Sequence, residues 1–270
     1  MKQRLDTLLV ELNLCPSRQL AQRLIRAGEV MVNQQLIDKP GTEVDVTADI
    51  QIKEKPPYVS RGGEKLAKAL EEFAISLEER ICLDGGISTG GFTDCLLQKG
   101  AKQVYGVDVG YGQVAWSLRN DPRVVLKERT NLRHLQPSDL YGDSQLADLA
   151  VVDVSFISLT KVLDALWQLL LPPREAILLV KPQFEVGRDR VGKKGVVRNP
   201  NDQAEAIFQV LQAAQQRGWQ YLGLTWSPIT GPAGNIEYLL WLGMDGQTSC
   251  PDLAAIQQIT QSAVTCLPKK

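Results

Sequence analysis

Residues 81–94 read Ile-Cys-Leu-Asp-Gly-Gly-Ile-Ser-Thr-Gly-Gly-Phe-Thr-Asp, and this stretch decides the fold. A short apolar run ends in an acid, Asp84, and a glycine-rich turn then leads into what reads as a helix. Glycine lets the backbone approach a ligand closely and adopts φ values that other residues avoid. Strand, turn and helix in this order place a helix N-terminus at the edge of a parallel sheet. We therefore expect an α/β domain with a ligand at this turn; a tight turn without any ligand is the alternative.

The spacing of the glycines separates two classes of cofactor. A dinucleotide-binding turn reads G-x-G-x-x-G, and this stretch does not, which disfavours a nicotinamide dehydrogenase. Asp84 to Gly90 read D-x-G-x-S-x-G instead, which resembles the S-adenosylmethionine loop of Rossmann-like methyltransferases. The next apolar run ends in Asp108, about 20 residues beyond the loop, where such folds hold ribose hydroxyls.

This resemblance implies a set of residues for S-adenosylmethionine. Asp84 would face the amine-bearing methionine end, and Asn131, after a strand over residues 124–131, is a candidate for the adenine edge, although a polar residue there is often only a cap. The expected cofactor-binding residues are Asp84, Gly86, Ser88, Thr89, Gly90, Asp108 and Asn131.

Length and composition limit the class of protein. A chain of 270 residues has room for one large domain, or a large and a small one. The net charge of −1 gives no global nucleic-acid signature, so any RNA-binding surface must come from local segregation of charge. A single histidine, His134, and five cysteines without a C-x-x-C pair argue against a metal site. With no signal pattern and no apolar span, we expect a cytoplasmic monomer with reduced thiols and no membrane contact.

The first sixty residues have their own pattern. Leucines at helical spacing predict a helix over 3–12, and Ser17 is a candidate N-cap for a second helix over 18–27 that Gly28 closes. Alternating apolar residues then predict short strands. Arg18, Arg23 and Arg26 fall in an acid-free segment, which favours RNA phosphates over the alternative of a solvated helix face.

This N-terminal order resembles the S-four-like RNA-binding module. R-L-D-x-L-L at 4–9 and S-R-x-x-A-x-x-L-I-x-x-G-x-V-x-V-N at 17–33 carry the resemblance, which adds Arg4 to the expected RNA-binding residues. Two prolines after Lys53 predict a stiff joint. We expect an RNA-binding domain at 1–55, a linker at 56–60, a Rossmann-like domain at 61–246 and a C-terminal extension at 247–270. The fold class is therefore α/β, a Rossmann-like methyltransferase domain with a small N-terminal α+β RNA-binding domain.

Four ionisable residues stand at the ends of expected elements. Apolar strands deliver Asp153 and Lys181 to the carboxyl edge of the sheet, and Glu237 opens the last apolar strand. A lysine that ends five apolar residues needs an acid nearby, because burial penalises its charge. Asp153 as a helix cap is the alternative for that residue. Helical periodicity places Lys65 and Lys68 on an exposed face, the ordinary place for a lysine.

A glycine-rich basic segment at 183–198 reads as a mobile loop that can meet phosphates, with a plain solvated loop as the alternative. Its cations are Arg188, Arg190, Lys193, Lys194 and Arg198.

The order Lys65, Asp153, Lys181, Glu237 around an S-adenosylmethionine-type loop resembles the FtsJ-type ribose 2′-O-methyltransferases. With the N-terminal module, the resemblance narrows to the TlyA family of rRNA methyltransferases, often labelled hemolysin A. Matching stretches include Ser88-Thr-Gly-Gly-Phe-Thr-Asp94, Val152-Asp-Val-Ser-Phe-Ile-Ser158, Val180-Lys-Pro-Gln-Phe-Glu185 and Gly231-x-x-Gly-Asn-x-Glu237.

The resemblance implies S-adenosylmethionine-dependent 2′-O-methylation of cytidine in ribosomal RNA of assembled subunits, without a metal. Lys181 would be the base, Lys65 a second cation, Asp153 the partner that positions Lys181, and Glu237 the residue that orients the lysines and the hydroxyl. Arg188, Arg190, Lys193 and Lys194 would grip RNA together with the N-terminal arginines. Ile87 stands where relatives carry a smaller residue, so we expect extra bulk beside the cofactor.

Two other functions stay open. A ribosome-assembly factor that binds RNA without turnover would share the fold, but all four positions of the tetrad are present. A cytolysin, as the hemolysin label suggests, would need a membrane-active segment that the sequence does not show.

Overall fold

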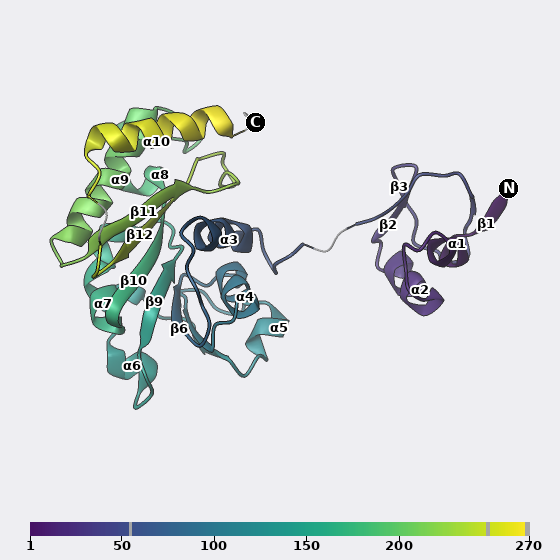
Figure 1. The fold of residues 1–270 in the computed structure, drawn as a ribbon, viewed down its shortest axis with the longest axis horizontal. Coiled ribbons are helices and arrows are strands. Elements are labelled where there is room, and N and C mark those ends of the chain that lie inside the picture. The colour runs from purple at the N-terminus through teal and green to yellow at the C-terminus, as the bar shows by residue number, and fades with distance from the viewer. Residues whose placement is uncertain (54–55, 247–248, 268–270) are drawn as a thin grey trace. The chain divides into compact units, whose positions relative to one another are not determined.

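The computed structural model describes residues 1–53, 56–246 and 249–267, and the chain divides into two compact units, 1–56 and 57–270. Figure 1 labels most of the helices and several strands of both units. The expected RNA-binding domain includes residues 54 and 55, and the expected C-terminal extension includes 247–248 and 268–270; these positions lie outside the described residues. Each unit is described by itself.

The first unit is a small α+β domain. Two helices pack on two small antiparallel sheets, one formed by β1 and β4 and the other ordered β3-β2-β5. Its elements are β1 (Lys2–Arg4), α1 (Leu5–Glu11), α2 (Arg18–Arg26), β2 (Val30–Val32), β3 (Gln35–Leu36), β4 (Glu43–Asp45) and β5 (Ile50–Ile52). The helix expected from residue 3 therefore begins at Leu5, because Lys2–Arg4 pair with β4, a contact that local periodicity cannot reveal.

A buried carboxylate ties the two helices of this unit together. Asp6 is fully buried and accepts hydrogen bonds from Arg4 at 3.0 Å, Arg18 at 3.0 Å and Gln22 at 2.8 Å. The guanidinium of Arg4 holds the pKa of Asp6 well below its usual range. Buried charges are retained when they are paired and hydrogen-bonded in this way.

The second unit is a three-layer sandwich around a seven-stranded sheet ordered β11-β12-β10-β9-β6-β7-β8. Six of the seven strands run in one direction, and β12 is antiparallel to both of its neighbours, β10 and β11. The strands are β6 (Ile81–Gly85), β7 (Gln103–Val107), β8 (Val124–Lys127), β9 (Ala147–Val152), β10 (Leu170–Val180), β11 (Gln220–Trp226) and β12 (Tyr238–Gly243).

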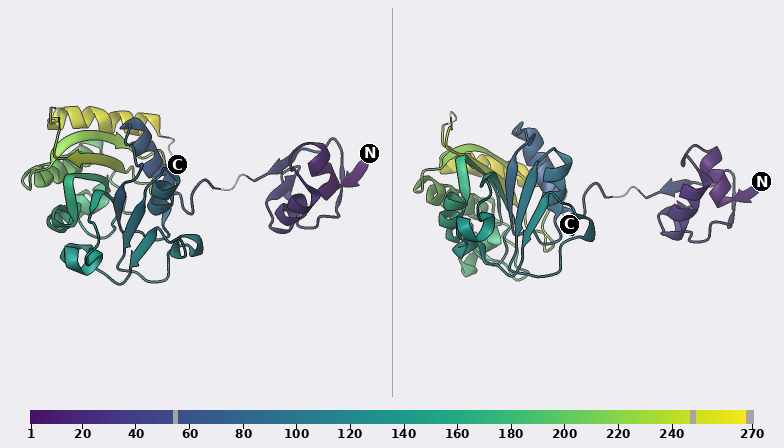
Figure 2. Two further views of the ribbon diagram at one scale, coloured as in Figure 1. Left: turned by 60° about the horizontal axis from the view of Figure 1, so that its bottom comes forward. Right: turned by 90° about the horizontal axis from the view of Figure 1, so that it is seen from below.

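Helices cover both faces of this sheet, as Figure 2 shows. One face carries α3 (Gly62–Glu72), α4 (Gly91–Gln98) and α5 (Trp116–Arg119). The other carries α6 (Pro137–Tyr141), α7 (Leu163–Leu169), α9 (Pro200–Gln215) and α10 (Leu253–Cys266). The expected C-terminal extension carries α10, which packs on α9 and buries Ile256 and Ala263 in the core. Short elements complete the unit: α8 (Pro182–Glu185) and the 3-10 turns η1 (Leu132–His134), η2 (Leu159–Lys161) and η3 (Arg188–Arg190).

Two boundaries follow from local backbone geometry. The helix α7 ends at Leu169, and β10 begins at Leu170, which pairs with Ala147 of β9. The residue before a proline avoids the helical region, and Leu171 precedes Pro172. The strand expected over 124–131 ends at Lys127, because the chain turns at Arg129 with a φ of 54°.

Among the residues described, no helix combines the length and apolar character that a membrane crossing requires.

The Asp6 contacts give a prediction for the first unit. In Asp6→Asn, we expect a loss of roughly 1–3 kcal/mol of local stability, because charged donors lose a buried acceptor. Native-state hydrogen exchange on the full chain should show faster exchange in α1 and α2 but not in β6 or β9. Asp38→Asn is the control, since Asp38 is exposed. Equal protection in the two variants would contradict this role of Asp6.

Candidate active site

The glycine-rich turn joins the end of β6 to the start of α4 at the carboxyl edge of the sheet. Gly86 has a φ of 91°, and a Cβ there would lie 2.5 Å from the carbonyl oxygen of Asp153. Gly90 has a φ of 101°, and a Cβ there would lie 2.3 Å from Leu118. Both positions require glycine, so the turn stays close to the end of β9 and leaves space on its outer side.

Two cavities lie around this turn. The glycine-loop cavity (about 240 Å³) is lined by Ser88 and Thr89 together with Lys65. The Asp108 cavity (about 350 Å³) is lined by Asp108 and Asn131. Gly86, Ser88 and Asp153 line both cavities, so the two form one elongated site around the turn.

Asp108 follows β7 and is held by the backbone of two loops. Its carboxylate accepts hydrogen bonds from the N–H groups of Ser88 at 2.8 Å and Gly110 at 2.7 Å. The side-chain oxygen of Asn131 caps η1 by accepting a hydrogen bond from the N–H of Arg133 at 3.0 Å, which is the alternative role considered for this residue. Asn131 also lines the Asp108 cavity.

Asp84 lies deeper than the sequence led us to expect. It is fully buried at the end of β6, and it is not among the residues that line the glycine-loop cavity. The hydroxyl of Thr93 donates to one carboxylate oxygen at 2.6 Å, and the other oxygen has no hydrogen-bond partner among the described residues. Burial raises the pKa of Asp84 to about 7.

Ile87 lines the glycine-loop cavity, as expected, but most of its side chain packs elsewhere. Its side chain is buried in the core with the helices α3 and α4 and packs toward Gly106 of β7. It therefore fills the space that the absent side chain of Gly106 leaves, rather than adding bulk in the cofactor site alone.

The four expected tetrad residues form two ion pairs. Lys181, directly after β10, lies 2.5 Å from Asp153, directly after β9. Lys65, on α3, lies 2.5 Å from Glu237, directly before β12. The hydroxyl of Ser155 accepts a hydrogen bond from Lys181 at 2.8 Å. Asp153 is thus an ion-pair partner and does not cap a helix; the next 3-10 turn is capped by Ser158.

The expectation that Lys65 is exposed was wrong. Lys65 and Lys181 are each only 8% exposed, whereas Lys68 is half-buried and donates to the carbonyl of Trp226. Helical periodicity shows which residues of α3 lie on the outer face of the helix, but it cannot show whether another segment covers that face. The segment that carries Glu237, 172 residues further along the chain, covers that face.

A third cavity brings the two ion pairs together. The Lys181 cavity (about 390 Å³) is lined by Lys181 and Glu237, whereas their partners Asp153 and Lys65 line the glycine-loop cavity. Each ion pair therefore has one residue that lines the glycine-loop cavity and one that lines the Lys181 cavity. The two pairs stand at the boundary between the two cavities, the position that a group-transfer reaction between two bound molecules requires.

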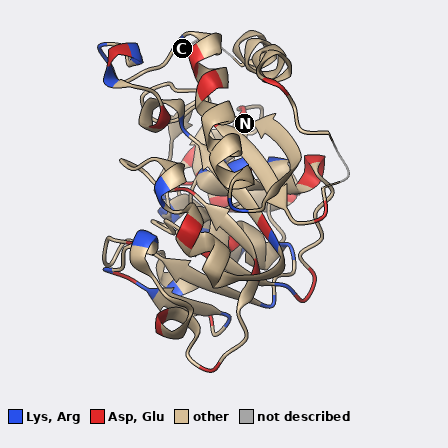
Figure 3. Cartoon of the chain, turned by 90° about the vertical axis from the view of Figure 1, so that its left-hand side faces the viewer, with Lys and Arg blue, Asp and Glu red and all other residues tan. Residues whose placement is uncertain are grey.

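The expected RNA-binding cations fall into two groups. Arg4 and Arg18 pair with buried Asp6, and Arg190 pairs with Asp202 and Glu205 of α9, so these three have structural partners. The other five are exposed and form no ion pair with a described residue: Arg23, Arg26, Arg188, Lys193 and Lys194. Acidic and basic residues are otherwise interspersed along the chain (Figure 3).

Several residues of the site were not singled out from the sequence. Ser155 bonds Lys181, and Gln183 lines the Lys181 cavity with a buried amide oxygen that has no partner among the described residues. Buried Glu185 accepts from the hydroxyl of Ser158 and the N–H of Leu159, which fixes the loop after β9; burial raises its pKa. These contacts join segments that are far apart in the sequence, so no local sequence pattern could have revealed them.

A mainly parallel sheet with an acid-first glycine turn and a charged edge defines a Rossmann-like methyltransferase, here preceded by a small α+β domain. Residues 58–244 match the model of the FtsJ-like methyltransferase family, and residues 3–50 match the S4 domain. This chain belongs to the TlyA family of FtsJ-like methyltransferases.

Three relatives illustrate the match. The 16S/23S rRNA (cytidine-2′-O)-methyltransferase TlyA of Mycobacterium tuberculosis is 49% identical over 241 residues, which cover 88% of this chain and 89% of that protein. YqxC of Bacillus subtilis, named as a proposed rRNA methyltransferase, is 47% identical over 275 residues, 100% of this chain and 97% of that protein. The solved structure of a proposed hemolysin from Streptococcus thermophilus is 41% identical, with a TM-score of 0.73 over 98% of this chain and 96% of that chain.

The buried carboxyl gives a prediction on pH. Because the pKa of Asp84 rises from 3.8 to about 7 on folding, the folded protein binds a proton that the unfolded chain has lost between these values. The free energy of unfolding therefore falls as pH rises from 4 to 7, by up to about 1.4 kcal/mol per pH unit from this group. Asp84→Asn should lose this slope.

The measurement is urea unfolding of the cofactor-free protein at several pH values, for the wild type, Asp84→Asn and Asp143→Asn. Asp143 is exposed, so its variant should follow the wild type. If the curves of the wild type and Asp84→Asn stay parallel from pH 4 to 7, Asp84 is not the group that titrates.

Proposed function

We propose that this chain transfers a methyl group from S-adenosylmethionine to the 2′-hydroxyl of a cytidine in ribosomal RNA, within assembled ribosomal subunits. The observation that carries the proposal is the position of the two ion pairs between the elongated site at the glycine turn and the Lys181 cavity. The substrate class comes from relatives such as the M. tuberculosis protein, whose name states cytidine-2′-O-methylation of 16S and 23S rRNA.

The residues at the turn fit S-adenosylmethionine. Gly86 brings the turn against the backbone of Asp153 and lines both cavities at the turn, and Asp108 offers an oriented carboxylate for ribose hydroxyls. The nucleoside part fits the Asp108 cavity, and the amino-acid part fits the glycine-loop cavity beside Ser88 and Thr89. When bound, this cofactor supplies an electrophilic methyl group on a positively charged sulfur.

The tetrad acts on the other reactant. A nucleoside in the Lys181 cavity would bring its 2′-hydroxyl to Lys181, which would accept the hydroxyl proton as the methyl–sulfur bond breaks and the methyl–oxygen bond forms. Asp153 and Ser155 fix the position of Lys181, and Glu237 fixes Lys65 as the second cation. Alignment of the oxygen with the methyl group then lowers the barrier by orientation.

The exposed cations supply contacts to the RNA backbone. Arg23 and Arg26 lie on α2 of the first unit, and Arg188, Lys193 and Lys194 lie on the basic segment near the Lys181 cavity. Phosphate contacts of this kind give affinity without sequence selectivity.

The function is tested by methyl transfer from radiolabelled S-adenosylmethionine to purified ribosomal subunits. We expect the wild type to label RNA and Lys181→Ala to lose about 10²–10⁴-fold in kcat, because a positioned proton acceptor is removed. Cofactor affinity should stay unchanged in this variant, since Lys181 does not line the cavities at the turn.

Lys99→Ala is the matched control, because Lys99 is exposed at the end of α4. A wild type that binds the cofactor yet labels neither subunit would favour the assembly-factor alternative. A Lys181→Ala variant as active as the control would leave the reaction without its proposed base.

A further inference from the structure

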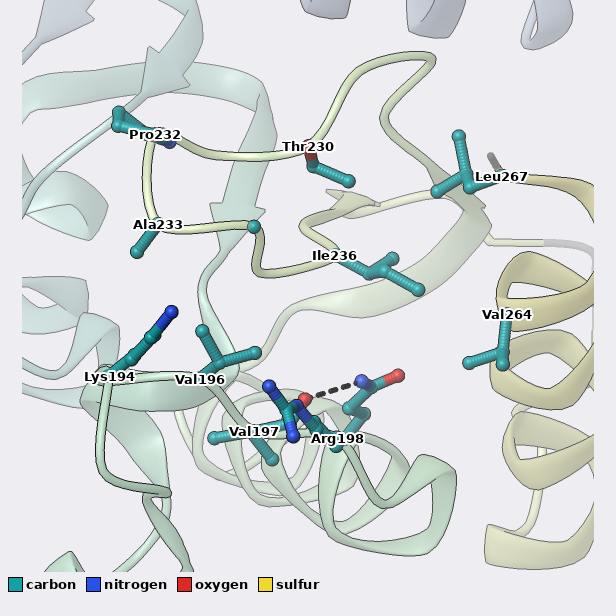
Figure 4. A pocket seen from close by; sticks show the side chains of 12 residues that line it. Lys194, Val196, Val197, Arg198, Thr230, Pro232, Ala233, Ile236, Val264 and Leu267 are labelled. Atoms are coloured by element: carbon teal, nitrogen blue, oxygen red, sulfur yellow. Dashed lines mark hydrogen bonds between the residues drawn. The ribbon is translucent and has the colours of Figure 1, made fainter. Parts of the chain in front are cut away.

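A fourth cavity lies beside the tetrad and has no role in the reaction described above. The Lys194 cavity (about 550 Å³) is lined by the end of the basic segment, by the turn over residues 230–236 and by α10. Figure 4 shows Lys194 and Arg198 on one wall and the apolar side chains of Ile236 and Val264 on others. Its volume falls within the ~300–1,000 Å³ that is typical of small-molecule sites.

A buried asparagine gives this cavity a fixed wall. Asn235 is only 2% exposed, and its side-chain oxygen accepts from the N–H of Val197 at 2.9 Å. Its amide nitrogen donates to the carbonyl of Gly195 at 2.8 Å. Gln203 of α9 donates to the carbonyl of Val197 at 2.7 Å, the bond drawn in Figure 4. Residues 195–197 are therefore clamped from two sides, which holds the flanking cations at the cavity.

The lining combines positive charge with an apolar surface. Lys194 and Arg198 are exposed, and neither forms an ion pair with a described residue. Unpaired cations at a cavity favour an anionic ligand, and the guanidinium of arginine suits phosphate. Val196, Ile236 and Val264 offer apolar contact for a flat ring. A phosphate joined to a planar base combines these two properties.

The Lys194 cavity adjoins the proposed site of methyl transfer. Lys194, Pro232 and Ala233 line both this cavity and the Lys181 cavity. Thr230 and Pro232 also line the glycine-loop cavity. A ligand in the Lys194 cavity would therefore contact some of the same residues as the nucleoside that receives the methyl group.

We propose that the Lys194 cavity binds the nucleotide next to the methylated one in the same RNA strand. Its base packs on Val196, Ile236 and Val264, and its phosphate meets Lys194 and Arg198. The proposal rests on the proposed function, because it takes RNA as the substrate. The enzyme then recognises at least two consecutive unstacked nucleotides.

The test fills the apolar part of the cavity without a change of charge. Val264→Trp places a large side chain from α10 into the cavity, and Thr265→Trp adds the same side chain to the next, exposed position. For ribosomal subunits, we expect the KM of Val264→Trp to rise about tenfold, the loss of one base contact, with kcat and cofactor affinity unchanged. Thr265→Trp should keep the KM of the wild type, and equal KM values for the two variants would overturn the proposal.

A binding measurement separates this site from the methylation reaction. Fluorescence anisotropy compares a cytidine-containing hexaribonucleotide with two versions that are abasic on either side of the cytidine, in the presence of S-adenosylhomocysteine. One abasic RNA should bind the wild type about tenfold more weakly than the intact RNA does. The same abasic RNA and the intact RNA should bind Val264→Trp with equal affinity. This pattern without methyl transfer would leave the site standing and the proposed function wrong; no effect of either abasic position would contradict the site itself.

Discussion

The close approach of the glycine turn to the end of β9 is the constraint on which the active site depends. Gly86 leaves no room for a side chain against the carbonyl of Asp153, and the N–H of Asp153 donates to Gly85 at 2.9 Å. The parallel register of β9 with β10 then fixes Lys181 beside Asp153. The contact between the glycine turn and Asp153 thus fixes how far the glycine-loop cavity lies from the Lys181 cavity.

The two buried lysines follow from this geometry. A lysine that is 8% exposed loses most of its hydration, and a carboxylate partner must offset that cost. Asp153 and Glu237 do so at 2.5 Å each. The pairs also hold both lysines on a shared boundary between two cavities, where they can act on a hydroxyl group that is presented to the cofactor.

Strand ends could be predicted from the sequence because they depend on local pattern. The apolar runs before Asp108, Asp153 and Lys181 gave the correct edge of the sheet, since carboxyl ends of parallel strands meet there. Contacts between distant segments could not be predicted in this way. Helical periodicity predicted that Lys65 is exposed, but the segment that carries Glu237 covers it. No local pattern shows that Arg4 and Arg18 bind the carboxylate of Asp6. The clamp of Asn235 on residues 195–197 likewise needs the folded chain.

In the proposed reaction, the tetrad directs the methyl group to a ribose oxygen. Mass spectrometry of nucleosides from ribosomal subunits treated with the wild-type protein and S-adenosylmethionine tests this step. We expect a new 2′-O-methylcytidine, with the added mass on the sugar fragment. A methyl group found on the base fragment would contradict this expectation, because the two lysines would then not be acting on a ribose hydroxyl.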